Sequence, residues 1–207
     1  MKFNFKIQQY QTDAVNAVVN VFSGQSYRKT SHYIRDLGTL EKPTVAQRSF
    51  DYENDPYDDI GCNNNALEPS SEQLLEKVHK IQRENNIKLS PELIKDLGRC
   101  SLDIEMETGT GKTYVYIKTM FELNKKYGWS KFIVVVPSIA IREGVYKTFE
   151  ITEDHFMEHY GKKARFFIYN SSNLNQLDNF SSDGGINVMI INTQAYAYSL
   201  KEDGKSK

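Results

Sequence analysis

Nine residues near the middle of the chain carry the groups that a phosphate-binding loop needs. They read Glu-Met-Glu-Thr-Gly-Thr-Gly-Lys-Thr and span Glu105–Thr113. A triphosphate requires several backbone N–H groups that converge on its oxygens, and a glycine-rich turn lets the backbone come that close. Gly109 and Gly111, with Thr108 and Thr110 beside them, supply such a turn. The pattern therefore predicts that this loop binds a nucleoside triphosphate.

Two side chains at the end of the loop have roles of their own. Lys112 stands at the offset where an ammonium group bridges the β- and γ-phosphates, which makes it the candidate catalytic residue. The hydroxyl of Thr113 is placed to ligate Mg²⁺, which keeps most of its shell as water and phosphate oxygen. We therefore expect ATP and Mg²⁺ as the ligands of this loop.

One position departs from the usual motif. The first residue of the pattern is normally Gly or Ala, and Met106 stands there. At average composition, a chance Gly-x-Gly-Lys-Thr in a chain of this length has odds below about one in a hundred. The alternative is a tight strand–helix turn that binds no ligand. The offsets of Lys112 and Thr113 favour the phosphate loop over that turn.

Strand and helix patterns alternate around the loop. Ser101–Met106 is expected to be a strand and Lys112–Tyr127 a helix. Lys131–Val136 reads KFIVVV, a run typical of a strand that is buried on both faces. The other expected elements are a helix over Ile139–Tyr160 with a break near Ile151–Glu153, and strands over Arg165–Tyr169 and Ile186–Ile191. This alternation predicts an α/β fold with a parallel sheet flanked by helices.

The chain before the loop divides into two parts. Apolar residues at helical spacing predict an amphipathic helix over Gln9–Phe22, which ends near Gly24. The next stretch, about Gln25–Arg99, is acidic between Asp51 and Asp59 and rich in turn residues. We interpret it as an insertion between two parts of the nucleotide site.

Two helices are expected within the insertion. An apolar stripe predicts a helix over Ser71–Glu84, with Ser70 or Ser71 as its N-cap. Pro91 is expected to open a second, shorter helix, with Ser90 as its cap.

Composition and charge limit the class of protein. Apolar residues make up 39% of the 207 residues and charged residues 26%, which fits a soluble globular protein. No apolar run approaches the roughly 20 residues that a membrane span needs, and we do not expect the start of the chain to be a secretory signal. The two cysteines form no metal-ligand pair, and we expect a cytoplasmic protein. The net charge of −1 gives no general indication of nucleic-acid binding.

Three features narrow the choice among phosphate-loop proteins. TGTGKT resembles motif I of superfamily 2 helicases and translocases. Tyr10 and Gln11, followed by Ala14, resemble the Q motif of that superfamily, whose glutamine reads the adenine edge. Alone, Gln11 would be interpreted as a surface residue at a helix start. The strand KFIVVV followed by Pro137 and Ser138 resembles motif Ia, which contacts a nucleic-acid backbone.

The resemblance is closer to one family, the restriction (Res) subunit of type III restriction enzymes. It covers about Lys2–Gly24 and Leu102–Tyr198, and Met106 is a familiar variant in that family. The segments that carry it are FKIQQYQTDAV, LDIEMETGTGKTYVYIKTMFELNKKYGWSKFIVVVPSIAIREGV, Phe149–Thr152, Tyr169–Ser171 and IINTQAY.

The resemblance implies a fold, an activity and partners. The fold is an incomplete RecA-like P-loop domain, with a Q-motif-like segment at 1–24 and the N-terminal half of a motor domain at 101–200. Outside the resemblance lie the acidic insertion at 25–100 and the polar tail at 201–207, whose composition predicts disorder. The family couples ATP hydrolysis to movement on duplex DNA, cuts DNA with a separate nuclease domain, and works with a modification (methyltransferase) subunit.

The resemblance also implies roles for single residues. Gln11 would contact adenine, and Thr108–Thr113 would hold the phosphates. Ser138, Arg142 and Thr193 would lie on the side that faces DNA. Each of these three has a plainer interpretation, namely a helix cap, a solvated helix residue and a turn residue.

Several parts of a motor are not apparent in the sequence. No acidic Walker B tetrad follows a late strand, and no nuclease cluster is present. We therefore expect a fragment of a larger subunit that hydrolyses ATP negligibly by itself. The alternatives are a non-enzymatic nucleotide-binding or interaction module and, with less support, a P-loop kinase.

Overall fold

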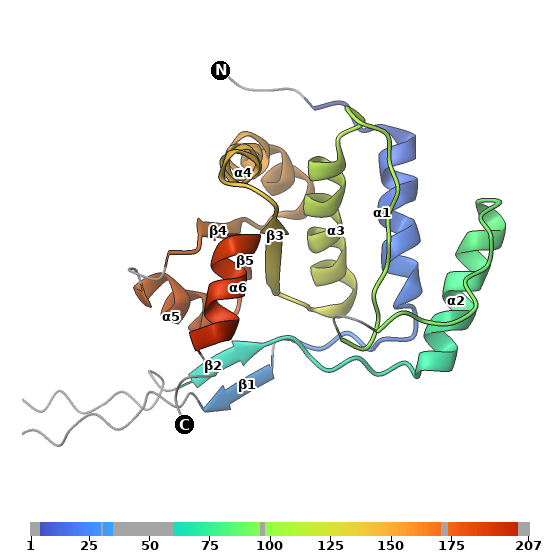
Figure 1. Ribbon diagram of the computed structural model, residues 1–207, viewed down its shortest axis with the longest axis horizontal. Coiled ribbons are helices and arrows are strands. Elements are labelled where there is room, and N and C mark those ends of the chain that lie inside the picture. The colour runs from blue at the N-terminus through green and yellow to red at the C-terminus, as the bar shows by residue number, and fades with distance from the viewer. Residues whose placement is uncertain (1–4, 30, 35–59, 96–97, 171–173, 203–207) are drawn as a thin grey trace, which may run out of the picture.

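The computed structural model describes residues 5–29, 31–34, 60–95, 98–170 and 174–202. Its helices and strands alternate along the second half of the chain (Figure 1). In chain order the elements are α1 (Gln9–Val21), β1 (Ser31–Ile34), β2 (Ile60–Asn63), α2 (Ser71–Glu84), α3 (Lys112–Tyr127), β3 (Lys131–Val136), α4 (Ile139–Tyr160), β4 (Ala164–Ile168), α5 (Leu174–Ser182), β5 (Ile186–Asn192) and α6 (Thr193–Glu202).

The central sheet is parallel, with the strand order β3-β5-β4. β5 pairs with both neighbours, so that Val134 lies opposite Ile190 and Phe166 opposite Val188. α4 connects β3 to β4, and α5 connects β4 to β5. Helix crossovers between parallel strands are the arrangement expected of an α/β protein. The predicted fold class is confirmed.

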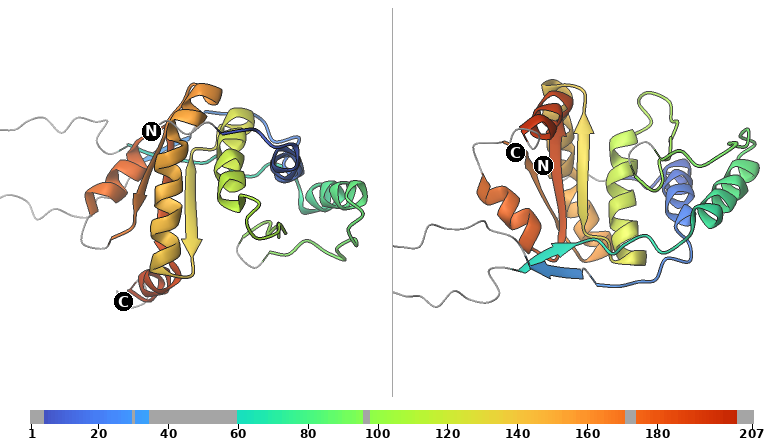
Figure 2. Two further views of the ribbon diagram at one scale, coloured as in Figure 1. Left: turned by 90° about the horizontal axis from the view of Figure 1, so that it is seen from above. Right: turned by 60° about the horizontal axis from the view of Figure 1, so that its bottom comes forward.

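Helices lie on both sides of this sheet (Figure 2). One side is the main core, where Ile117 of α3 and Phe156 of α4 are buried against Val188 and Ile190 of β5. On the other side, Phe180 of α5 contacts Phe167, with the ring centroids 6.0 Å apart. Side chains alternate between the two faces of a strand, so Phe166 and Phe167 serve different layers.

β3 differs from the prediction that it is buried on both faces. Ile133 and Val135 are 52% and 44% exposed, whereas Val136 is buried. In the described sheet β3 pairs with β5 alone, so it is an edge strand. A β-branched run favours a strand, but it does not reveal which neighbours the strand has.

Ser101–Met106 forms no strand, and this prediction was also wrong. The segment runs alongside α1 on its way to the phosphate loop (Figure 1). Its alternating pattern suits a half-buried strand, but a strand also needs a neighbour for its backbone. The described part of the chain places no such neighbour beside it.

Two helix predictions were wrong in detail. α4 continues unbroken through Ile151–Glu153, where Thr152 is 1% exposed and its Oγ1 donates to Thr148 O at 2.7 Å. No helix begins at Pro91. Ser90, its expected cap, is bound to α2 instead, because its N–H donates to Gln82 Oε1 and its hydroxyl accepts from Gln82 Nε2.

The insertion contains one confirmed element and one that the sequence did not reveal. α2 has the predicted bounds, and Ser70 caps it in a capping box with Gln73. The antiparallel pair β1–β2 was not predicted. Asn64, just after β2, accepts from the backbone N–H groups of Ser130 and Lys131 and so fixes the insertion to the start of β3.

The remaining predictions concern the C-terminal tail and the acidic stretch of the insertion. α5 and α6 were not predicted, and α6 reaches Glu202, inside the expected disordered tail. The rest of that tail and the acidic stretch from Asp51 to Asp59 lie outside the described residues. Among the helices that are described, none is long and apolar enough to cross a membrane.

Candidate nucleotide site

The predicted phosphate loop precedes α3 and leaves the start of that helix open. Gly109 and Gly111 both have positive φ angles, +83° and +86°. Gly111 is the N-cap of α3, and no side chain accepts a hydrogen bond from the first turn. The first turn also contains no acidic residue. A helix start with free N–H groups and a positive partial charge is suited to bind an anion.

The two glycines are needed for different reasons. A Cβ atom on Gly109 would meet nothing within 4 Å, so the space beside this residue is open. A Cβ atom on Gly111 would lie 2.6 Å from the side-chain nitrogen of Gln11. Both positions require glycine for the left-handed backbone, and Gly111 also requires it for close contact with Gln11.

Lys112 is turned back onto the loop. Its ammonium group donates to Met106 O at 2.5 Å and to Glu107 O at 2.9 Å. The hydroxyl of Thr110 donates to the same Glu107 carbonyl at 2.6 Å. The loop therefore closes around its own lysine, which is the group that an incoming phosphate would compete for.

Gln11 reaches the same loop from α1. It is 9% exposed, and its Nε2 donates to Thr110 O at 2.9 Å. Tyr10 donates to that carbonyl as well, at 3.1 Å, although nothing in the sequence analysis gave the tyrosine a role of its own. The structure thus brings Gln11 together with the phosphate loop across 99 positions of sequence.

Packing between α1 and α3 maintains this contact. Val15 and Val19 of α1 are buried against Val115 and Leu123 of α3. Farther along, the hydroxyl of Tyr127 donates to Val19 O at 2.9 Å. Because both helices are rigid, the position of Gln11 relative to the loop follows from this interface.

A histidine behind the loop was missed by the sequence analysis. His155 of α4 is 8% exposed, and its Nε2 lies 2.9 Å from the hydroxyl of Tyr114 in the first turn of α3. Its ring also contacts Phe5 and His159. Burial lowers the pKa of His155, and His159 lowers it further. A lone histidine in a helical pattern carries no signal that could have revealed this contact.

The three predicted DNA contacts lie around the carboxyl ends of β3 and β5. Thr193 begins α6, and its Oγ1 donates to Pro137 O at 3.4 Å. Ser138 is the N-cap of α4 and accepts from Ile141 N at 3.3 Å. Arg142 is paired with Glu143 at 2.9 Å. The structure therefore gathers these residues, and each already has a partner within the chain.

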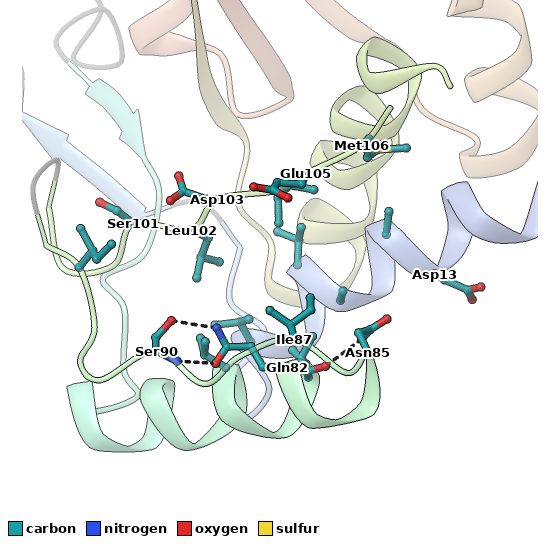
Figure 3. Close-up of a pocket in the computed structure, with 18 of the residues that line it drawn as sticks. Asp13, Gln82, Asn85, Ile87, Ser90, Ser101, Leu102, Asp103, Glu105 and Met106 are labelled. Carbon is teal, nitrogen blue, oxygen red and sulfur yellow. Dashed lines mark hydrogen bonds between the residues drawn. The ribbon is translucent and has the colours of Figure 1, made fainter. Parts of the chain in front are cut away.

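A cavity of about 580 Å³ adjoins the phosphate loop (Figure 3). It lies between α1, α2 and residues 101–107, and Tyr10, Met106 and Thr110 form part of its wall. Its lining residues include no lysine, arginine or histidine. Among all the residues that the structure describes, no group of three or more His, Cys, Asp or Glu side chains could hold a metal ion.

A family model and the similar proteins all point to one family. The profile described as "Type III restriction enzyme, res subunit" matches residues 4–207. The EcoPI Res subunit of Escherichia phage P1 is 34% identical over 168 residues, which are 78% of this chain and 14% of the relative. The EcoP15I Res subunit of Escherichia coli is 36% identical over 110 residues, or 52% of this chain and 11% of the relative.

A third relative, the StyLTI Res subunit of Salmonella typhimurium, is 46% identical over 87 residues. That match covers 41% of this chain and 8% of the relative. The matched region thus spans between 8% and 14% of the length of these three proteins.

Proposed function

This chain belongs to the type III restriction enzyme Res subunit family, and we propose that it is the part that binds ATP with Mg²⁺. The observation that carries the proposal is the open start of α3. Two glycines with positive φ precede it, no side chain caps it, and Lys112 is within reach. The family supports a helicase-like ATPase as the kind of protein to which this site belongs.

The loop residues divide the work of holding the phosphates. The backbone N–H groups of Thr108–Thr113 would donate to phosphate oxygens, and Lys112 would leave the carbonyls of Met106 and Glu107 to bind the phosphates. Thr113 would offer its hydroxyl to Mg²⁺, which would supply positive charge to neutralise the phosphates. Lys112 is the residue that stabilises charge during transfer.

Gln11 selects the base. Its Nε2 is committed to Thr110 O, which leaves Oε1 as the group that can meet a base. An oxygen acceptor suits the exocyclic amino group of adenine and opposes the carbonyl oxygen of guanine. ATP should therefore bind more tightly than GTP.

Replacement of Gln11 tests this assignment. Gln11→Ala should weaken ATP binding and reduce the preference for ATP over GTP, measured by calorimetric titration with both nucleotides. Gln9→Ala is the matched control, because the exposed Gln9 side chain donates to Asp13 of the same helix. If Gln11→Ala leaves the ratio of the two affinities unchanged, the adenine assignment is wrong.

For the whole subunit we propose movement on duplex DNA, with a modification subunit as partner, DNA cleavage by a separate domain, and a cytoplasmic location. The proposed DNA contacts are Ser138, Arg142 and Thr193, which lie at the carboxyl ends of β3 and β5. Arg142 would exchange Glu143 for a phosphate. Log affinity for duplex DNA should fall with log salt concentration, and a slope near zero would argue against phosphate contacts.

For the chain alone we propose nucleotide binding with negligible turnover. Phosphoryl transfer needs a positioned water and further positive charge, and Lys112 and Thr113 supply part of this. A multiple-turnover assay with DNA-stimulated hydrolysis by these 207 residues would contradict this proposal.

A further inference from the structure

One tyrosine hydroxyl of α3 is buried without a hydrogen bond. The side-chain oxygen of Tyr116 is shielded from solvent and has no partner at hydrogen-bonding geometry among the described residues. By contrast, the hydroxyls of Tyr114, Tyr127 and Tyr160 each have a partner at 2.8 to 2.9 Å. Buried polar groups in proteins are nearly always hydrogen-bonded, so the exception at Tyr116 needs an explanation.

The position of Tyr116 on α3 places its side chain beside Thr113. Residues three apart on a helix are neighbours, and helical side chains tilt toward the N-terminus of the helix. The Tyr116 side chain therefore covers the turn that contains Thr113. Burial raises the pKa of Tyr116, and the hydroxyl of Thr113 partly offsets this rise, as a nearby donor does. The two hydroxyls are thus neighbours that have not closed a regular hydrogen bond.

Thr113 differs from other threonines within the helices of this chain. The hydroxyls of Thr119, Thr148 and Thr152 each donate to the carbonyl four residues earlier, at 2.7 to 2.8 Å. The residue four positions before Thr113 is Gly109, which lies in the loop and has a positive φ. Within the described part of the chain, the Thr113 hydroxyl forms no bond of this kind. Its proton is therefore not held by the backbone.

This arrangement fits the role of a metal ligand. A threonine oxygen that binds Mg²⁺ uses a lone pair for the metal, and its proton then needs an acceptor. A bound cation also makes that proton a stronger hydrogen-bond donor. The first turn of α3 contains no acidic residue that could accept it, whereas the oxygen of Tyr116 lies beside it and has no other partner.

We propose that Tyr116 is a positioning residue for Thr113 in the binding of Mg²⁺ with ATP. The Tyr116 oxygen accepts the proton of the Thr113 hydroxyl, which leaves a lone pair of Thr113 Oγ1 free for the metal. The hydrogen bond closes when the nucleotide and the metal are bound, and the buried tyrosine oxygen then has its partner. This inference rests on the proposed ATP and Mg²⁺ site and adds a residue outside the phosphate-loop motif.

Replacement of Tyr116 by phenylalanine removes the acceptor and keeps the ring. ATP is titrated by calorimetry into the 207-residue chain, once with Mg²⁺ and once with EDTA. The dissociation constant in EDTA divided by that in Mg²⁺ is the magnesium ratio. Tyr116→Phe should lower this ratio about tenfold and change the affinity in EDTA little, because groups that orient a metal ligand affect metal binding by at least that much. Urea unfolding without nucleotide should show no loss of stability, since no closed hydrogen bond is removed.

Tyr127→Phe is the matched control on the same helix. The hydroxyl of Tyr127 donates to Val19 O at 2.9 Å, at the far end of α3 from the loop. This variant should unfold at a lower urea concentration and keep the magnesium ratio of the unmodified chain. A purely structural role for Tyr116 would give the pattern of the control, and that result would overturn the proposal.

A double variant tests whether the effect of Tyr116 passes through Thr113. Thr113→Ala should remove most of the magnesium ratio. Tyr116→Phe added to Thr113→Ala should then cause no further loss, because the two side chains act as one unit. Additive losses would show that Tyr116 acts by another route and would contradict the proposal.

A spectroscopic measurement decides the question even if Tyr116→Phe does not fold. A meta-fluorotyrosine at position 116 keeps the hydroxyl, and its fluorine NMR signal should shift more with ATP and Mg²⁺ than with ATP in EDTA. Equal shifts would overturn the proposal. Failure of the proposed Mg²⁺ site looks different, because the unmodified chain would then bind ATP equally well with and without Mg²⁺. A chain that needs Mg²⁺ but keeps its magnesium ratio in Tyr116→Phe contradicts the role of Tyr116 alone.

Discussion

The starts of α3 and α4 differ in whether a side chain of the protein accepts a hydrogen bond from their backbone N–H groups. α4 begins after Ser138, whose side chain accepts from Ile141 N and so satisfies one of them. α3 begins after Gly111, which has no side chain to offer. Both helices have the same partial charge at this end, but that of α4 is already capped by Ser138.

The difference shows that a helix start is not by itself a ligand site. What matters is the residue at the cap position and the groups around it. At α3 a glycine leaves the N–H groups free and brings Lys112 near, whereas at α4 the serine is occupied and Arg142 is paired with Glu143. The start of α3 can thus accept an anion directly. At the start of α4, Ser138 and Arg142 must first give up their hydrogen bonds within the chain before they can bind DNA.

The largest expected effect comes from removal of the lysine at the open helix start. Lys112→Ala should weaken Mg·ATP binding up to about 100-fold, since a hydrogen bond to a charged group contributes up to about 3 kcal/mol. Isothermal titration measures the change. Lys118→Ala is the control on the same helix, because Lys118 donates to Thr12 on α1 and does not touch the loop. Similar losses in both variants would contradict the role of Lys112.

A second comparison separates the two glycines of the loop. Gly109→Ala and Gly111→Ala should each cost about 1–2 kcal/mol of unfolding free energy, because alanine is strained at positive φ. Gly111→Ala should cost about 1 kcal/mol more, since its Cβ displaces Gln11 from Thr110. Urea unfolding measures both. Equal losses would show that the contact with Gln11 does not stabilise the fold.

The cap of α4 gives a smaller effect. Ser138→Ala should lower the unfolding free energy by about 1 kcal/mol, and Ser138→Asp should keep it, because aspartate is also a good N-cap. Ser70→Ala at the capping box of α2 is the control of equal stability cost. If Ser138 also contacts DNA, Ser138→Asp should weaken duplex binding while Ser70→Ala leaves it unchanged. Loss of stability in Ser138→Asp would argue against the cap.

The smallest effect concerns the contact between Tyr114, in the first turn of α3, and His155, near the end of α4. The pKa of His155 is lowered in the folded protein, so the unfolded chain takes up its proton more readily. Stability from this group is therefore present above the ordinary pKa of 6.5 and is lost as the pH falls toward the lower pKa of the folded state. Urea unfolding at pH 7.5 and 5.5 should show a smaller difference in His155→Gln. An unchanged difference would remove His155 as its cause.

The sequence by itself determined most of the local elements and predicted the role of the loop. α2, α3, α4 and β3 have the predicted bounds, because caps, periodicity and β-branched runs act over a few neighbouring residues. The order Gly-Thr-Gly-Lys-Thr likewise predicts a phosphate loop from neighbouring residues alone.

Only the tertiary structure decided what lies beside these elements. The edge position of β3, the absence of a strand at Ser101–Met106 and the contact of His155 with Tyr114 all depend on partners that are distant in sequence. The partial exception is Gln11, whose motif pointed to the nucleotide site by resemblance. Its hydrogen bond to Thr110 exists because α1 packs on α3, and no local pattern encodes the surface on which a helix comes to rest.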